Sequence, residues 1–264
     1  LKDGVNDITE YIAEAVKRKM PALAVTDHAS ISAFPNAYEF SKRYPEFKMI
    51  YGMEAYMVND DDKAVPCKCS ENLDGEFIAI DIEITGVNPF KDRITEISAK
   101  RFKNGEILDS FYSLVNPGIH ISEGVAKLTG ITNEMVKDSE RIEAVLKRFI
   151  SFCGNIPLIS DNGNFCVKLL KHNAKTFGME YEPCMLDISR IALGLLPDLK
   201  SRRISEICKN LGIKGPDDSS TSEIVDATIK IFLRICADLK KKGITKVSDI
   251  NSCVESCYKD RYRH

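Results

Sequence analysis

The 264-residue sequence has no tryptophan, only four histidines and a formal net charge of −2, with an isoelectric point near 6.2. Because lysine and arginine are not in excess, any nucleic-acid binding must use a local basic surface. The near-neutral charge argues against a sequence-reading DNA-binding protein. It does not argue against an enzyme whose metal ions bring their own positive charge.

The sequence also lacks any run of the roughly 20 apolar residues that a membrane-spanning helix needs, and no signal peptide opens it. We therefore expect a cytoplasmic protein with no membrane partner. Because the chain begins with Leu1, close to a predicted helix, we expect an excised piece of a longer protein.

The nine cysteines do not follow the spacing of a zinc ribbon. One residue separates Cys67 from Cys69, and three separate Cys253 from Cys257. The few histidines offer little to complete such a site. We expect reduced structural thiols and no metal cluster.

A hydrophobic content of 44% and a charged content of 29% are typical of a globular protein, here with one large or two modest domains. In the first segment, Asp7 to Glu10 resembles a capping box ahead of a helix over residues 8–16. A strand over 22–26, a helix over 35–43 and a strand over 49–51 follow. Residues 59–75 are polar and irregular, which predicts a domain boundary there.

The second segment alternates strands and then turns mostly helical, which predicts an α/β fold with a mixed sheet flanked by helices. An apolar strand covers 77–83, and a half-buried strand covers 94–102. Asn104-Gly105 predicts a hairpin turn to a partner strand over 107–115. Helices are predicted over 142–152, 165–177 and 224–239, with a short strand over 157–160. Asp187 is predicted to cap a helix that ends near Leu195.

Two carboxylates interrupt the apolar strand, at Asp81 and Glu83. Residues two apart in a strand share a face, so these anions lie side by side and need a cation between them. Oxygen ligands favour Mg²⁺ or Mn²⁺, and two such ions roughly 4 Å apart can hydrolyse a phosphodiester. The alternative is a strand end where both carboxylates reach solvent or pair with Lys91 or Arg93.

Thr85 and Gly86 follow directly and would let a substrate backbone come close to the metals. The run from Asp81 to Gly86 resembles the first motif, Asp-x-Glu-Thr-Thr-Gly, of the DnaQ-like (DEDD) 3′–5′ exonucleases. Residues 128–132 are similar to the substrate-side loop of that family. Residues 195–200 are similar to a segment of the exonucleases carried inside polymerases. The resemblance covers roughly residues 74–248.

The resemblance implies a ribonuclease H-like sheet and two-metal removal of nucleotides from the 3′ end of single-stranded DNA, with Mg²⁺ or Mn²⁺ as cofactor. Asp81, Glu83 and Asp226 would be the catalytic residues and metal ligands. The residues implied along the DNA strand are Thr85, Gly86, Leu128, Thr129, Asn162 and Phe165.

The sequence departs from the family at two of five expected positions. In the second motif, His-Asn-Ala-x-Phe-Asp, Cys166 stands where the family has aspartate. In the third, His-x4-Asp, Thr221 stands where the family has its general base. A thiol is a neutral, soft group near pH 7, and a threonine hydroxyl cannot accept the proton. We therefore expect hydrolysis to be severely weakened or absent.

Ordinary structural roles fit the replaced positions. Ser220 and Glu223 can cap the last helix, and Cys166 can be a small buried residue. Asp161 or Asp187 could substitute as a ligand, although nothing in the sequence favours that. The alternative function is a catalytically inactive module of the same fold that binds single-stranded DNA or serves as polymerase scaffold.

The first segment resembles the PHP domain of the PolC-type DNA polymerase III family, into which an exonuclease domain is inserted. The resemblance lies in residues 26–28, 32–38 and 51–55. It implies a partial PHP-like segment at 1–73, an exonuclease domain at 74–248 and a tail at 249–264 that returns to the PHP domain. Partners would be the polymerase domains of the same polypeptide and other replisome proteins.

By the same resemblance Asp27, His28 and Glu54 would be metal ligands of the PHP domain. The chain does not contain the rest of that site, so we expect a scaffold without chemistry. A PHP-type phosphoesterase is the less favoured third interpretation.

Overall fold

The computed structural model describes residues 7–28, 31–54, 63–65, 67, 69–199, 201–216 and 220–254. The chain divides into two compact units, Leu1–Asp60 and Asp61–His264. Residues 255–264 of the predicted tail (249–264) and Lys200 lie outside the described residues.

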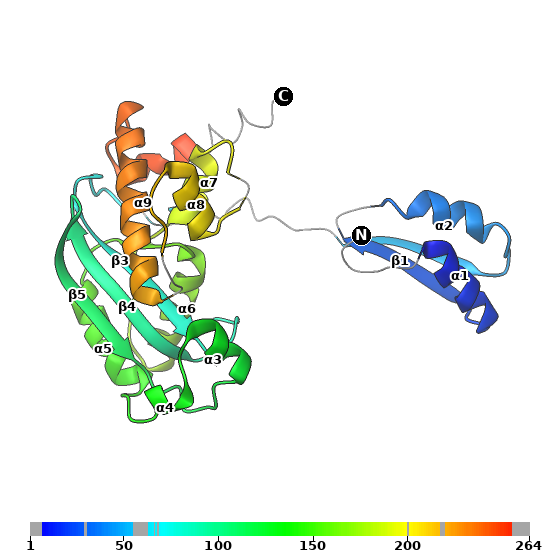
Figure 1. Ribbon diagram of the computed structural model, residues 1–264, viewed down its shortest axis with the longest axis horizontal. Helices are drawn as coiled ribbons and strands as arrows, with labels where there is room; N and C mark the ends of the chain where they lie inside the picture. The colour runs from blue at the N-terminus through cyan, green and yellow to red at the C-terminus, as the bar shows by residue number, and fades with distance from the viewer. Residues whose placement is uncertain are drawn as a thin grey trace. The chain divides into compact units, whose positions relative to one another are not determined.

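The first unit has the predicted order helix, strand, helix, strand: α1 (Ile8–Lys17), β1 (Ala22–His28), α2 (Phe34–Ser41) and β2 (Lys48–Glu54) (Figure 1). Asp7 caps α1, since its side chain accepts a hydrogen bond from the Thr9 backbone N–H at 2.9 Å. The two strands are parallel, and their register pairs His28 with Glu54. Two of the three PHP-type positions therefore end neighbouring strands.

The second unit contains a five-stranded mixed sheet. Its strands are β3 (Glu76–Ile84), β4 (Ile94–Lys103), β5 (Glu106–Leu114), β6 (Leu158–Ser160) and β7 (Met185–Asp187), in the order β5-β4-β3-β6-β7. β3, β4 and β5 are antiparallel, whereas β6 and β7 run parallel to β3. Asn104 and Gly105 adopt φ of 51° and 90°, so the predicted hairpin turn between β4 and β5 is confirmed.

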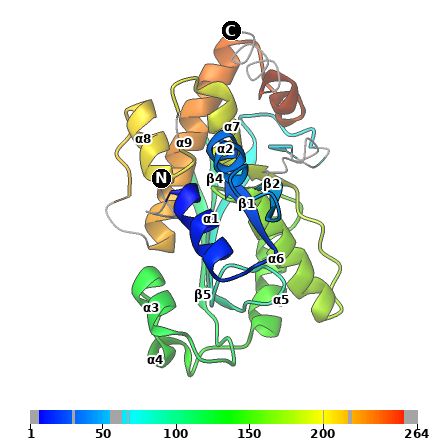
Figure 2. The same ribbon diagram turned by 90° about the vertical axis from the view of Figure 1, so that its right-hand side faces the viewer.

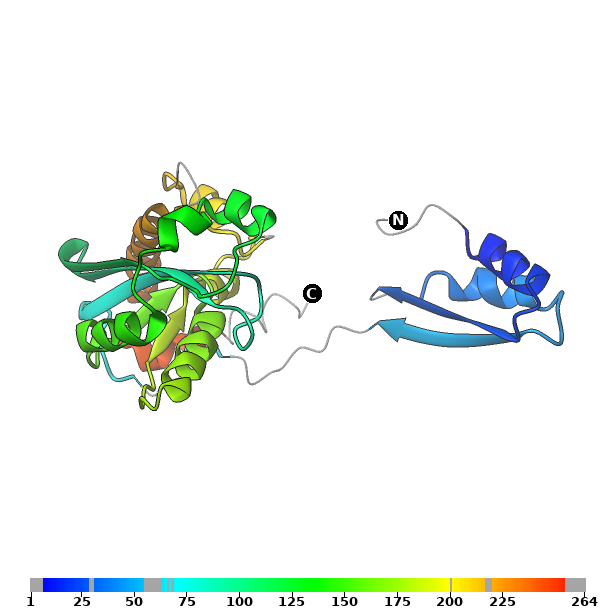
Figure 3. The same ribbon diagram turned by 90° about the horizontal axis from the view of Figure 1, so that it is seen from below.

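Helices cover both faces of this sheet. α5 (Ile142–Cys153) and α6 (Gly163–Thr176) lie on one face, and α9 (Thr221–Lys241) lies across the other (Figures 1 and 3). α7 (Ile188–Leu195) and α8 (Ile204–Leu211) pack beside α9 (Figure 2). The short helices α3 (Glu123–Thr129), α4 (Asn133–Val136) and a 3₁₀ turn (Val247–Asp249) complete the unit. Among the described residues, no helix is long and apolar enough to cross a bilayer.

The central strand β3 divides its side chains between two cores. Phe77 and Ala79 pack into the core formed with α7, α8 and α9. Ile78 and Ile80 pack into the core formed with α5 and α6. By this alternation Asp81 projects to the α9 face, and so does Glu83, the next acid on the strand.

Three sequence-based expectations need correction. β4 is not half-buried: residues 94–99 are all buried, because helices cover both faces of this inner strand. Leu128 and Thr129 do not lie in a loop, since they form the last turn of α3, which Gly130 ends at φ 75°. Cys67 and Cys184 are not reduced thiols but a disulfide that joins the segment before β3 to the residue before β7.

An aromatic contact fastens α9 to the sheet and gives a stability prediction. The centroid of the Phe232 ring lies 4.7 Å from the centroid of Phe77 and 6.0 Å from that of Phe102, and all three side chains are fully buried. Phe232→Ala should lower the free energy of unfolding by about 3–5 kcal/mol, because it leaves a cavity. Denaturant titration measures this. Val87→Ala, at a side chain that is 87% exposed, is the control and should stay within about 0.5 kcal/mol of wild type.

Candidate functional site

Asp81 and Glu83 lie near the carboxyl end of β3, and among the described residues neither forms an ion pair with a cation. Burial raises the pKa of Asp81 well above its usual range, and the charges of Asp161 and Glu83 raise it further. Burial, then the charges of Glu96 and Asp161, raise the pKa of Glu83 to about 7. Glu96 is the register partner of Glu83 on β4. These acids destabilise one another's charged forms.

The alternative partners named from the sequence do not neutralise this pair. Lys91 and Arg93 are both exposed. Within the described part of the chain, neither forms an ion pair with Asp81 or Glu83. The two acids are therefore neither fully solvated nor paired by the loop that follows β3.

The Asp161 charge acts on both β3 carboxylates, although nothing in the sequence favoured Asp161 over Asp187. It follows β6, and burial raises its own pKa, with a further contribution from the Asp187 charge. Asp187 instead caps α7 as predicted: its side chain accepts from the Arg190 backbone N–H at 3.0 Å. Asp161 is thus the nearer candidate for an additional carboxylate.

Cys166 is confirmed as a small buried residue of α6, with 3% of its surface exposed. Its Sγ lies 3.3 Å from the Ser160 Oγ, a contact in which either atom can donate. Burial raises the pKa of the thiol far above its usual value, and the charges of Asp161 and Asp81 raise it further. The group at this position is therefore a neutral thiol at pH 7.

Asp226 and Thr221 both lie near the start of α9. Ser220 caps the helix, as predicted, by accepting from the Glu223 backbone N–H at 3.4 Å. Thr221 is the first helical residue and is 2% exposed. The Asp226 carboxylate accepts a hydrogen bond from the Lys100 ammonium at 2.6 Å. No pattern in the sequence indicated this pair.

The metal-ligand role of Asp81, Glu83 and Asp226 stays a prediction. Asp81 and Glu83 share the end of β3, whereas Asp226 is paired with Lys100. In the ranges that the structure describes, no three His, Cys, Asp or Glu side chains are placed to hold one metal ion.

Thr85 and Gly86, predicted to face substrate, have structural roles in the loop after β3. The Thr85 Oγ1 accepts from the Arg93 backbone N–H at 3.0 Å. A Cβ on Gly86 would lie 2.5 Å from the Asp92 carboxylate. That carboxylate also accepts from the Val87 backbone N–H at 2.9 Å, which holds the loop closed. A side chain at position 86 would therefore have to displace the Asp92 carboxylate, which gives this glycine a structural role that needs no substrate.

The remaining predicted substrate residues differ in how far they are exposed to solvent. Leu128 is 76% exposed on α3. The Thr129 Oγ1 donates to the Val125 carbonyl at 3.0 Å. Asn162 is exposed before α6, and Phe165 is partly buried against the α5–α6 core. Leu128 and Asn162 are therefore free to meet a ligand, whereas Phe165 is mostly a packing residue.

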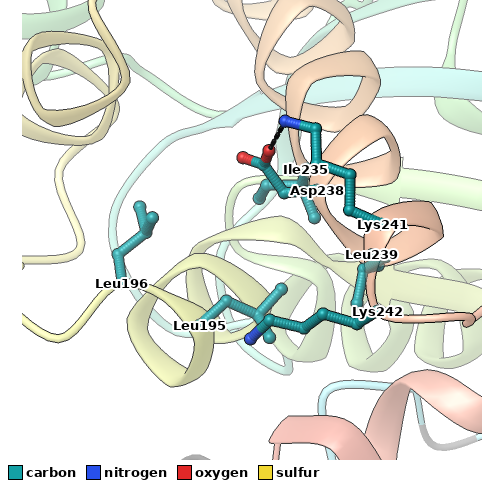
Figure 4. Close-up of a pocket in the computed structure, with 7 residues that line it drawn as sticks. All are labelled: Leu195, Leu196, Ile235, Asp238, Leu239, Lys241 and Lys242. Atoms are coloured by element: carbon teal, nitrogen blue, oxygen red, sulfur yellow. Dashed lines mark hydrogen bonds and ion pairs between the residues drawn. The ribbon is translucent and has the colours of Figure 1, made fainter.

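A pocket of about 300 Å³ lies away from these residues, between the last turns of α7 and α9 (Figure 4). Leucine and isoleucine side chains line it, and Lys241 and Asp238 form an ion pair at its rim. Asp226 lies nine residues or more before every α9 residue that lines it. The pocket is thus separate from the carboxylates.

Comparison with known proteins places the larger unit. The Exonuclease family, RNase_T, matches residues 78–218, more than half of the chain, and the chain belongs to this family. DNA polymerase III PolC-type from Caldanaerobacter subterraneus subsp. tengcongensis is 40% identical over 250 residues, 95% of this chain and 18% of the relative. The Thermotoga maritima protein of that name is 32% identical over 252 residues, 94% of this chain and 18% of the relative. The chain spans under a fifth of these curated relatives.

Solved structures confirm the predicted mixed α/β, ribonuclease H-like fold. E. coli exonuclease I in complex with a dT13 oligonucleotide aligns with a TM-score of 0.55 at 18% identity, over 64% of this chain and 42% of that one. The nuclease domain of 3′hExo, a DEDDh family member bound to rAMP, aligns with a TM-score of 0.51 at 24% identity, over 64% and 92%. At these identities the likeness concerns the fold alone.

The elevated pKa of Glu83 predicts how stability depends on pH. Between pH 4.5 and about 7 the folded protein holds a proton that the unfolded chain releases, so stability should fall as pH rises through this window. Glu83→Gln should flatten that fall and stabilise the protein at pH 8 by about 1–2 kcal/mol, allowing for solvent screening. Urea denaturation across pH 4–9 measures it. The exposed Glu106→Gln should keep the wild-type slope; an unchanged slope in Glu83→Gln would contradict the prediction.

Proposed function

We propose that the chain belongs to a PolC-type DNA polymerase III and that residues 74–248 are its 3′–5′ exonuclease domain, acting on the 3′ end of single-stranded DNA. Residues 1–73 would be a partial PHP-like segment, and 249–264 the return to it. Membership of the Exonuclease family and the 40% identity to a PolC-type polymerase support this assignment. A solved neighbour, E. coli exonuclease I, carries a dT13 oligonucleotide.

One observation carries the proposal: the central strand of an exonuclease-type sheet ends in two acids that form no ion pair with any residue the structure describes. Asp81 and Glu83 share one face of β3 and are partly buried. Such an arrangement costs stability and is retained where the carboxylates serve a reaction or a ligand. Polymerase domains of the same polypeptide and other replisome proteins would be the partners.

The residues present do not fit the two-metal arrangement of the family, whose members generally depend on divalent metal ions. Two Mg²⁺ or Mn²⁺ held by Asp81, Glu83 and Asp226 would require Asp226 to leave Lys100. The Cys166 thiol is protonated at pH 7 and shares a hydrogen bond with the Ser160 hydroxyl. We therefore derive no metal-dependent step for this chain.

Hydrolysis is accordingly proposed to be weak or absent. Loss of a general base alone costs about 10²–10⁴ in rate, and Thr221 supplies none. The second candidate function is an inactive module that binds single-stranded DNA or serves as polymerase scaffold. The ion pair between Asp226 and Lys100 favours it, because that pair occupies one of the three remaining acids.

Incubation of the full chain with 3′-labelled single-stranded DNA and Mn²⁺ separates the two functions. A residual exonuclease shortens the DNA slowly, and Asp81→Ala should remove that shortening to background. The exposed Glu106→Gln is the matched control and should leave the rate unchanged. DNA that binds but is not shortened would identify the inactive module, and shortening that survives Asp81→Ala would reject the assigned site.

Restoration of the family residues tests the decay of the site. Cys166→Asp with Thr221→His, in a Lys100→Met background that frees Asp226 from its ion pair, should raise the rate by about 10² or more over that background, because it returns a carboxylate and a general base. Cys166→Ser with Thr221→Ser is the control, since it changes both positions without adding either group. If the restored variant folds, as its circular dichroism reports, and its rate does not rise, the alignment of these two positions is mistaken.

A further inference from the structure

Lys100 lies where the β4 strand crosses beneath α9. Its ammonium is 2.6 Å from the Asp226 Oδ1 and 3.4 Å from the Ser222 Oγ. The side chains of Lys100 and Asp226 are 21% and 38% exposed. A pair shielded to this degree is screened less by water and salt than a surface ion pair.

Strand register fixes this position relative to the β3 acids. Lys100 is opposite Ala79, and the next pair on the same face is Ser98 opposite Asp81. The pair after that is Glu96 opposite Glu83. One face of the β3–β4 ribbon thus carries Lys100 and then three acids, Asp81, Glu83 and Glu96.

α9 is held in a matching register. Phe232 packs on Phe77 and Phe102, and Asp226 lies about 9 Å nearer the start of the helix, at 1.5 Å per residue. Phe102 is two residues from Lys100, about 7 Å along the strand. Asp226 and Lys100 therefore lie at similar distances from the Phe232–Phe102 contact, one along the helix and one along the strand.

We infer that the Lys100 ammonium is the resident counter-charge of Asp226 and stands in place of a metal ion at that carboxylate. Among the described residues, Asp226 pairs with Lys100, whereas Asp81, Glu83 and Asp161 form no ion pair. The pair joins α9 to β4 without any divalent cation. The site thus has a further reason not to suit two metal ions, besides the replacements at Cys166 and Thr221: Lys100 already neutralises Asp226.

This inference rests on the proposed function for its comparison with metal-dependent exonucleases. Its test does not require hydrolysis, because it measures Mn²⁺ binding and thermal stability. If the chain shortens no DNA but Lys100 excludes Mn²⁺, the inference stands and the exonuclease assignment fails. If the chain shortens DNA but Lys100 does not exclude Mn²⁺, the inference fails and the exonuclease assignment stands.

The experiment uses the full chain, with Mn²⁺ binding followed by electron paramagnetic resonance and melting followed with EDTA or with Mn²⁺. In wild type, Mn²⁺ should shift the melting temperature little. Lys100→Met should melt lower in EDTA, because Asp226 loses its partner. Mn²⁺ should restore most of that loss and should bind at least about tenfold more tightly than to wild type, since a repelling cation is gone.

Three further variants give the controls. Lys100→Arg keeps the charge and should behave as wild type toward Mn²⁺. Lys103→Met, at an exposed lysine of the same strand, should change neither measurement. Asp226→Asn should leave Mn²⁺ affinity unchanged within about twofold in wild type, but should abolish the affinity gained in Lys100→Met.

Two results would overturn the inference. One is a wild-type chain that binds two Mn²⁺ and loses one through Asp226→Asn, which would make Asp226 a metal ligand despite Lys100. The other is a Lys100→Met variant with native circular dichroism whose Mn²⁺ affinity equals that of wild type.

Discussion

The central strand β3 must supply two hydrophobic cores at once, and the rest of the larger unit depends on that constraint. Phe77 and Ala79 serve the α9 side, and Ile78 and Ile80 serve the α5–α6 side. The strand is therefore apolar on both faces, which is typical of a strand between two helix layers. On the α9 side the apolar pattern stops at Asp81, so Asp81 and Glu83 are half-buried acids, and neither forms an ion pair with a described residue.

α9 contacts the sheet at two places of different chemistry. Its middle packs on the sheet through Phe232, and its first turns bring Asp226 to Lys100. Ser220 caps its first turn, and Thr221 is buried at its start. Because Thr221 is buried, a histidine at this position must also find room for its larger side chain.

Local chemistry made most of the second unit predictable. The apolar runs of β3 and β6, the Asn104-Gly105 turn and the caps at Asp187 and Ser220 each carry their own signal in the sequence. Burial of all six residues of 94–99 was not readable, because it depends on helices from distant parts of the chain. The disulfide between Cys67 and Cys184 joins residues 117 apart and left no spacing signal.

The site was also predictable only where its geometry depends on residues close together in the sequence. Asp81 and Glu83 stand two apart in one strand, so their shared face follows from the sequence alone. Lys100 could not be found, since the loop of residues 85–93 leaves the β3–β4 register open until the strands are paired, and Asp161 could not be preferred over Asp187 until β6 was paired with β3. Once paired, that register places a fixed cation on the face that holds the acids. The register, more than the loss of any single motif residue, then decides whether Asp226 is available to a metal ion.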